Sequence, residues 1–277
     1  MTISDPSVPV SSVASADAFR ELHHRPGEPL LLPNAWDHAS ACALAEAGFA
    51  AVGTTSLGVA AAAGLPDGAG RTRGETLRLV RQLARPIRSG RLLLTVDIEG
   101  GFSDDPAEVA ALAGELAGAG AVGVNLEDGR ADGGLTPAPL HAAKIRAVKA
   151  AVPWLFVNAR TDTHWLRRGD LAETTSRLAA YQDAGADGVF VPGLAEEGSV
   201  VAAVGATGLP LNVLAVPGGP SLARLAELGV RRVSLGSLLF RLGLGTAVDA
   251  AVRLRAGDAL PSAPRALDYG AVQALTE

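Results

Sequence analysis

Residues 91–101 read RLLLTVDIEGG, a short apolar run that ends in two acids and two glycines. The stretch from Leu92 to Val96 predicts a fully buried parallel strand, with Asp97 and Glu99 following at its carboxyl end. Residues two apart in a strand share a face, so both carboxylates are expected to point to one spot. A divalent cation is the usual reason to hold two like charges together. A solvated strand end that happens to carry acids fits this stretch equally well.

The rest of the chain repeats the same unit, a short apolar strand, a loop and an amphipathic helix. Predicted strands span residues 30–33, 50–54, 92–97, 122–127, 154–160, 188–192, 211–214 and 233–235, and predicted helices span 38–47, 73–83, 106–117, 139–150, 171–184, 196–204, 221–228 and 238–255. Strict alternation of eight strands and eight helices predicts an α/β protein with a (β/α)8 TIM-type barrel. An open doubly wound sheet is the alternative, but no G-x-G-x-x-G opens a helix after the first strand.

Three of the predicted helices end in similar sequences, AEAGFAAV, AGAGAVGV and QDAGADGVFV. In each, a glycine just past the helix leads into the next apolar strand, as expected of a short helix-to-strand connection. No internal linker interrupts the pattern, so we expect one domain over residues 1–277. Within it, residues 1–25 are expected to hold a frayed, polar N-terminal extension and a first helix near 16–23, and residues 256–277 a C-terminal tail.

Composition excludes several kinds of partner. The chain has 24 Lys and Arg against 29 Asp and Glu, a net charge of −5, and no polybasic run, so nucleic acid is not expected as a partner. The longest uncharged stretch, Gly48–Pro66, is broken by hydroxyl residues and glycines and is a poor membrane span. Cys42 is the single cysteine. Because one cysteine cannot form an intramolecular disulfide, we expect a cytoplasmic protein.

Polar side chains gather where the strands end. Three consecutive strands deliver Asp97 and Glu99, then Glu127 and Asp128, then Asn158, Arg160 and Asp162. Neighbouring strands lie about 4.8 Å apart, so these groups are expected within roughly 10 Å of one another. Carboxylates beside an arginine predict a Mg²⁺ site together with a clamp for an anionic substrate. The turn at residues 53–58, GTTSLG, either holds an anionic group through backbone N–H donors or is an ordinary strand-to-helix turn.

The combined motifs resemble the isocitrate lyase / phosphoenolpyruvate mutase superfamily. The matching pieces are NAWDHASA at 34–41, TTSLG at 54–58, GLPD at 64–67, VDIEGGF at 96–102, NLEDG at 125–129, KIRAV at 144–148, NARTD at 158–162 and YQDAGADGVFVPG at 181–193. They follow the family order over roughly residues 25–240. VDIEGG is a variant of the commoner D-x-D-x-G form, in which Glu99 replaces the second aspartate.

The resemblance implies roles for particular residues. Mg²⁺, with Mn²⁺ as a possible substitute, would be bound directly by Asp97, with Glu99 and Glu127 holding metal-bound waters. The implied catalytic residues are Asp67, Arg160 and Glu127. The implied substrate-binding residues are Trp36, Thr55, Ser56, Leu57, Asn212 and Arg160, although packing is the alternative for Trp36 and a bond to a neighbouring loop for Asn212.

The loop after the fourth strand departs from the family. Residues 129–137 read GRADGGLTP, with neither the K-[KR]-C-G-H segment of isocitrate and methylisocitrate lyases nor the K-T-N segment of phosphoenolpyruvate mutases. The remaining fit is a Mg²⁺-dependent lyase that cleaves a C–C bond in, or decarboxylates, a small 2-oxo or 2-hydroxy di- or tricarboxylate through an enolate. The alternatives are a C–P phosphonomutase or phosphonopyruvate hydrolase and, from another class, a non-catalytic carboxylate-binding barrel.

The resemblance also implies an assembly. Family relatives commonly exchange the last helix between subunits and form dimers of dimers. We therefore expect a homotetramer in which the helix near 238–255 is swapped between subunits.

Overall fold

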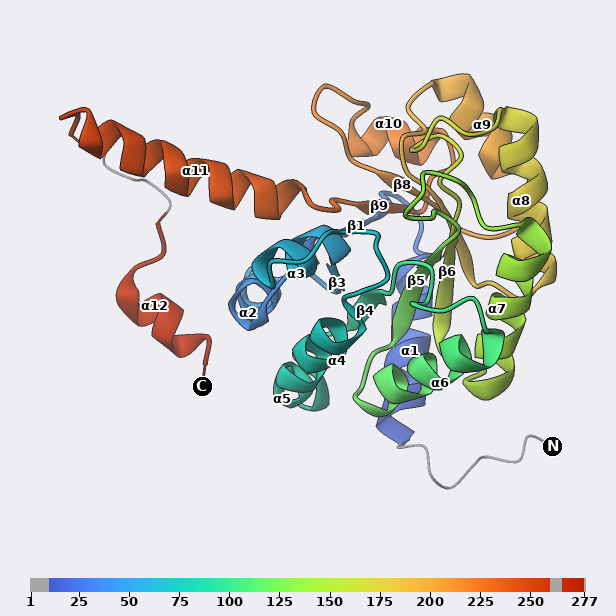
Figure 1. The fold of residues 1–277 in the computed structure, drawn as a ribbon, viewed down its shortest axis with the longest axis horizontal. Coiled ribbons are helices and arrows are strands. Elements are labelled where there is room, and N and C mark those ends of the chain that lie inside the picture. Colours follow the sequence, from blue (N-terminus) through green and yellow to red (C-terminus); the bar gives the residue numbers. More distant parts are fainter. Residues whose placement is uncertain (1–9, 260–265, 277) are drawn as a thin grey trace.

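The computed structural model describes residues 10–259 and 266–276, and its strands form one sheet in which every neighbouring pair is parallel (Figure 1). The strands are β1 (Leu30–Leu32), β2 (Asn34–Ala35), β3 (Val52–Thr54), β4 (Leu94–Asp97), β5 (Gly123–Glu127), β6 (Phe156–Arg160), β7 (Gly188–Val191), β8 (Leu211–Leu214) and β9 (Arg232–Ser234). The helices are α1 (Val10–Leu22), α2 (His38–Glu46), α3 (Ser56–Ala62), α4 (Arg73–Gln82), α5 (Ala84–Arg88), α6 (Pro106–Gly118), α7 (Ala138–Ala151), α8 (Leu171–Asp183), α9 (Glu197–Gly205), α10 (Leu222–Glu227), α11 (Leu238–Arg255) and α12 (Tyr269–Ala274).

The sheet closes on itself at the first strand. β1 pairs with β9 and β2 pairs with β3, so both edges of the sheet meet on residues 30–35. Pro33 separates β1 from β2 because it has no N–H to donate. Its carbonyl still accepts a hydrogen bond from the backbone N–H of Gly53, at 2.9 Å. The predicted (β/α)8 barrel is confirmed, with its first strand in two parts.

Helices follow the strands as predicted, with three additions. α3, α5 and α12 were not predicted. α3 begins inside the turn predicted at residues 53–58, and α5 is a short helix that contains Pro86. The first helix begins at Val10, earlier than expected. The rest of the expected frayed start, residues 1–9, and residues 260–265 of the expected tail lie outside the described residues.

The glycines after α2, α6 and α8 have the conformation that the sequence implied. Gly48, Gly120 and Gly185 have φ of 87°, 106° and 93°, a region that residues with a Cβ rarely adopt. A Cβ at Gly120 would also lie 2.6 Å from Cγ2 of Ile87. These glycines let each helix end abruptly and feed the next strand.

The two faces of the strands differ in character. Val96, Val124 and Val157 are fully buried in one apolar cluster with residues of α6 and α7. Asp97, Asn125 and Asn158, by contrast, stand side by side on β4, β5 and β6. Barrel interiors are usually filled by Val, Ile and Leu. A polar row inside this barrel therefore marks the interior as functional.

α11 extends away from the barrel, and α12 lies on the side of α2, where the carbonyl of Leu275 is 3.1 Å from Nε2 of His38 (Figure 1). None of the residues of α11 is buried. Among the described residues, no helix combines the length and the apolar character that crossing a membrane requires.

Candidate active site

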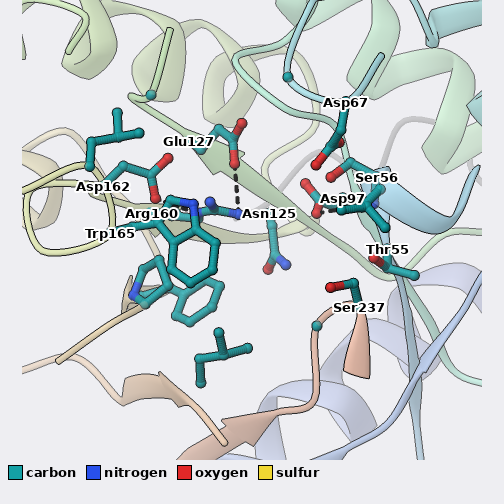
Figure 2. A pocket seen from close by; sticks show the side chains of 18 of the residues that line it. Thr55, Ser56, Asp67, Asp97, Asn125, Glu127, Arg160, Asp162, Trp165 and Ser237 are labelled. Atoms are coloured by element: carbon teal, nitrogen blue, oxygen red, sulfur yellow. Dashed lines mark hydrogen bonds and ion pairs between the residues drawn. The ribbon is translucent and has the colours of Figure 1, made fainter. Parts of the chain in front are cut away.

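A pocket of about 320 Å³ opens at the carboxyl ends of the strands (Figure 2). Asp97, Glu127 and Arg160 all contribute to its wall, so the three groups on which the sequence argument depends share one site. Other residues of the wall are Asn34, Thr55, Ser56, Leu57, Asp67, Asn125, Arg130, Asp162, Trp165, Phe190 and Ser237.

Arg160 is held between two carboxylates. Its Nη1 lies 2.7 Å from Oε2 of Glu127, its direct partner on the neighbouring strand, and its Nε donates to Oδ1 of Asp162 at 2.6 Å. The ring of Phe190 lies 5.6 Å from Cζ of Arg160. Although burial disfavours the charged form, Glu127 and Asp162 raise the pKa of Arg160. The guanidinium therefore stays charged, and its Nη2 bonds to no acceptor within the described ranges.

Asp97 ends β4, and its carboxylate is only loosely held. The backbone N–H groups of Glu99 and Ser56 donate to it at 3.3 and 3.5 Å, and no basic side chain forms an ion pair with it in the described part of the chain. Burial raises its pKa, Arg160 opposes that shift, and Asp67 adds to it. Burial likewise raises the pKa of Glu127 well above its usual value, despite Arg160. Such carboxylates favour an added cation at the site.

Glu99 does not line the pocket of Asp97. Its Oε1 accepts from the hydroxyl of Thr72 at 2.6 Å, and its Oε2 accepts from the backbone N–H of Gly70 at 2.9 Å. β4 ends at Asp97 and Glu99 has φ of 48°, so the strand alternation does not extend to Glu99. The expected common direction of the two carboxylates is not observed. Glu99 instead secures the loop between α3 and α4.

Asp128 also lies outside the pocket, although the sequence argument grouped it with Glu127. It is fully buried, and its Oδ2 accepts from Nη1 of Arg177 at 3.0 Å and from the hydroxyl of Tyr181 at 2.6 Å. Its Oδ1 accepts from the backbone N–H of Asp162 at 2.8 Å. Asp128 thus ties α8 to the strand ends and positions the loop that carries Asp162.

The expected substrate-binding residues divide into two groups. Thr55, Ser56 and Leu57 line the pocket. Trp36 and Asn212 do not belong to its wall. Trp36 packs edge-to-face on Phe240 with ring centroids 5.5 Å apart, and Asn212 donates to the hydroxyl of Ser234 at 3.0 Å. The packing alternative for Trp36 matches its contact, whereas Asn212 bonds to the neighbouring strand β9 and not to a loop.

Two loops cover the pocket. Asp67, from the loop after α3, is exposed and lies over Asp97 (Figure 2). The loop after β5 forms a small hairpin closed by a bridge between Gly129 and Leu135. It places Arg130 at the pocket, with Nη1 3.2 Å from Oδ2 of Asp104. Arg130 and Arg160 are the basic residues of the wall as far as the structure describes it.

Sequence reasoning missed several residues of the wall. Asn125 precedes Glu127 by two positions on β5 and so faces the same side, a signal that the alternation rule offers. Asn34 accepts the backbone N–H groups of Leu235 and Gly236 at 3.0 and 2.8 Å and fixes the loop after β9. Trp165 and Ser237 come from loops, and no periodicity in the sequence marks them.

Within the described ranges, no group of three or more His, Cys, Asp or Glu side chains is arranged to hold a metal ion. This does not conflict with a Mg²⁺ site, because Mg²⁺ is usually bound by one or two carboxylates and keeps several waters. The carboxylates of the wall, Asp67, Asp97, Glu127 and Asp162, offer oxygen atoms, the ligand type that Mg²⁺ prefers.

Comparison with known proteins gives consistent matches along the chain. The family model described as phosphoenolpyruvate phosphomutase matches residues 19–255. An uncharacterized protein of Mycobacterium tuberculosis is 44% identical over 258 residues, 93% of this chain and 95% of that protein. An oxaloacetate decarboxylase of Pseudomonas paraeruginosa is 32% identical over 216 residues, 74% of this chain and 71% of that protein. A crystal structure described as a "putative lyase/mutase" from Burkholderia cenocepacia covers 96% of both chains at 36% identity, with a TM-score of 0.86.

Proposed function

Because the chain belongs to the phosphoenolpyruvate phosphomutase family, within the isocitrate lyase / phosphoenolpyruvate mutase superfamily, we propose that it is a Mg²⁺-dependent lyase. Its substrate is a small 2-oxo or 2-hydroxy di- or tricarboxylate, from which it cleaves a C–C bond or removes CO₂ through an enolate. One observation carries this proposal. The pocket wall has four carboxylates, Asp67, Asp97, Glu127 and Asp162, against two guanidiniums. An anionic substrate is repelled by such a wall unless a cation accompanies it.

The residues present fit that cation. Asp97 would bind it directly, since within the described residues its carboxylate has no ion-pair partner and only long hydrogen bonds. Glu127 and Asp67 line the same pocket and would help to hold the cation. Glu99 contributes indirectly, because it fixes the loop that carries Asp67. Bound Mg²⁺ supplies charge neutralisation for the oxygens of a 2-oxo acid.

Side chains of the barrel hold and orient the substrate. Arg160 binds a substrate carboxylate through its remaining Nη2, while Glu127 and Asp162 keep its guanidinium plane fixed. Thr55, Ser56 and Leu57 border the opposite side of the site. Trp165 and Phe190 add apolar wall that excludes water and strengthens these charge interactions.

The proton for the enolate carbon comes from water or from a carboxyl group. No thiol or imidazole belongs to the wall in the described part of the chain, and the hairpin at 129–135 offers neither. The similarity to an oxaloacetate decarboxylase favours decarboxylation.

A substrate panel tests the proposal. Purified protein is incubated with 2-oxo and 2-hydroxy diacids, with Mg²⁺ or with EDTA, and products are followed by ¹H NMR. We expect turnover of at least one diacid with Mg²⁺ and none with EDTA. Phosphonopyruvate followed by ³¹P NMR covers C–P chemistry. Oxalate binding by calorimetry with no turnover of any compound would instead identify a non-catalytic binding barrel.

We also propose that α11 packs against a second copy of the chain, in a swapped dimer and a dimer of dimers. Five of its apolar side chains are 46–57% exposed, namely Leu242, Leu244, Val248, Val252 and Leu254. A row of exposed apolar residues on one helix is typical of an interface. Sedimentation velocity should show a homo-oligomer, and a variant with Leu244→Glu and Val248→Glu should sediment as a smaller species. A monomeric wild type would overturn this part of the proposal.

A further inference from the structure

Arg232 is a buried cation inside the barrel, and the reaction proposed above gives it no role. It lies on β9 and is fully buried. It forms no ion pair with a carboxylate anywhere in the described ranges, and its Nη1 is buried without a hydrogen-bond partner there. Burial lowers its pKa to about 9, so the group is still charged at neutral pH. An unpaired charge in a protein interior is costly and calls for a functional reason.

Arg232 forms hydrogen bonds with two residues that line the pocket. Its Nε donates to the hydroxyl of Ser234 at 3.2 Å, and its Nη2 donates to Oδ1 of Asn125 at 3.1 Å. Ser234 and Asn125 both line the pocket, and Asn125 is labelled between Arg160 and Asp97 in Figure 2.

Chemistry fixes the orientation of the Asn125 amide. A guanidinium has only donors, so the atom that faces Arg232 must be the amide oxygen. The side-chain Nδ2 of Asn158 donates to the same oxygen at 2.9 Å. With its oxygen occupied twice, Asn125 has its NH₂ group left over, and this group donates to no acceptor in the described part of the chain. The NH₂ group is the part of Asn125 available to a ligand in the pocket.

We propose that Asn125 donates a hydrogen bond to the substrate oxygen that gains negative charge, and that Arg232 is its positioning residue. This inference rests on the proposed function. Arg232 holds the amide oxygen and its charge polarises the amide, which makes the NH₂ group a stronger donor. Asn158 prevents the amide from rotating. Gly188 leaves room for this arrangement, since a Cβ there would lie 3.0 Å from Oδ1 of Asn158.

The test uses oxalate, a planar dianion with the shape of a small enolate. Full-length wild type, Asn125→Ala, Arg232→Met and Arg232→Lys are titrated with oxalate in the presence of Mg²⁺, and separately with Mn²⁺ alone. We expect Asn125→Ala to weaken oxalate binding by about 10- to 100-fold, the worth of one charge-assisted hydrogen bond. In Asn125→Ala, Mn²⁺ affinity should change less than about threefold, because Asn125 is uncharged and does not belong to the proposed cation ligands.

Coupling between the two residues distinguishes positioning from mere packing. Arg232→Met should weaken oxalate binding in the wild-type background and have little further effect on Asn125→Ala. Arg232→Lys keeps the charge and should recover part of the loss. Lys149→Met is the matched control. It removes a cation that bonds to Asp187 at 2.7 Å near the opposite ends of the strands, so oxalate affinity should not change.

Each remaining outcome counts against the inference. Equal oxalate affinity for wild type and Asn125→Ala overturns it, as does an additive effect of the two substitutions. If Arg232→Met does not fold, Arg232→Lys and Asn125→Ala still decide the question. A wild type that binds neither Mn²⁺ nor oxalate refutes the proposed function, and this inference with it.

Discussion

Glu127 and Asp128 are neighbours in sequence, yet each belongs to a different arginine cluster. Glu127 points into the barrel, where it pairs with Arg160 at 2.7 Å beside the pocket. Asp128 points outward, where it pairs with Arg177 at 3.0 Å beneath α8. Both clusters are buried and both hold a guanidinium against carboxylates.

The two clusters differ in how completely they are satisfied. In the outer cluster both oxygens of Asp128 accept short hydrogen bonds, Oδ2 from Tyr181 at 2.6 Å and from Arg177 at 3.0 Å, and Oδ1 from the backbone N–H of Asp162 at 2.8 Å. In the inner cluster Asp97 accepts only at 3.3 and 3.5 Å within the described residues, and both Asp97 and Arg160 line the pocket, whereas Asp128 and Arg177 do not. A saturated network stabilises the fold, whereas an unsaturated one that opens into a pocket is available to a ligand. The comparison predicts loss of activity from the inner cluster and loss of stability from the outer one.

The largest effect should come from Arg160→Lys. Lysine keeps the charge but cannot hold Glu127, Asp162 and a substrate carboxylate with one planar fork. We expect kcat/KM to fall by about 10³, or roughly 4 kcal/mol, with a nearly unchanged thermal midpoint. Steady-state kinetics and calorimetry on the same preparation measure both. Full activity in this variant would contradict the proposal that Arg160 binds a substrate carboxylate.

Next in size is Arg177→Met, which leaves Asp128 buried without its cation. We expect the free energy of unfolding to fall by about 3–5 kcal/mol. Activity per folded molecule should stay within about threefold, because Arg177 does not line the pocket. Urea unfolding followed by circular dichroism provides the first number. If stability holds and activity disappears, the assignment of the outer cluster to structure is wrong.

A smaller effect concerns pH and His141, which packs against Tyr181 of the outer cluster with ring centroids 4.6 Å apart. Burial, with smaller contributions from the charges of Lys144 and Arg177, lowers the pKa of His141 to about 3. The unfolded chain takes up this proton below about pH 6.5, while the folded chain does not until about pH 3. Stability is therefore lost as the pH falls through this window, by about 1.4 kcal/mol per pH unit.

His141→Phe removes that proton uptake. Urea unfolding of wild type and variant at pH 7, 6 and 5 compares their slopes, and the variant should lose less stability over this range. Parallel slopes would mean that His141 is protonated in the folded protein.

The smallest effect should follow Arg224→Gln. Arg224 pairs with Glu197 and Glu227 at 2.6 and 2.7 Å, but all three side chains are 45–65% exposed. Exposed ion pairs contribute little because water competes with them. Differential scanning calorimetry should find no measurable shift of the midpoint, and kinetics no change. This variant gives the baseline against which both buried arginines are compared.

The same alternation rule explains where sequence reasoning succeeded and where it failed. It predicted the barrel and brought Asp97, Glu127 and Arg160 to one pocket, because all three lie within regular strands. Past the strand ends the rule no longer applies. Glu99 has a left-handed backbone and turns to Thr72. Asp128 instead obeys the rule, because it follows Glu127 by one residue and turns the opposite way, to α8, and grouping it with Glu127 neglected the alternation.

Other features depend on contacts between distant parts of the chain. The pairing of Arg232 with Asn125 joins residues 107 positions apart, which no local pattern encodes. Trp36 packs on Phe240 for the same kind of reason. The roles of the site residues, the cation and the assembly remain predictions.

Dependence of turnover on Mg²⁺ tests the central claim most directly. Initial rates with a diacid that the panel identifies are measured over a Mg²⁺ titration for wild type and Asp97→Ala in parallel. The account predicts that wild-type activity rises from zero to saturation and that Asp97→Ala stays inactive at every concentration. Turnover in EDTA, or a wild-type rate from Asp97→Ala, would contradict it.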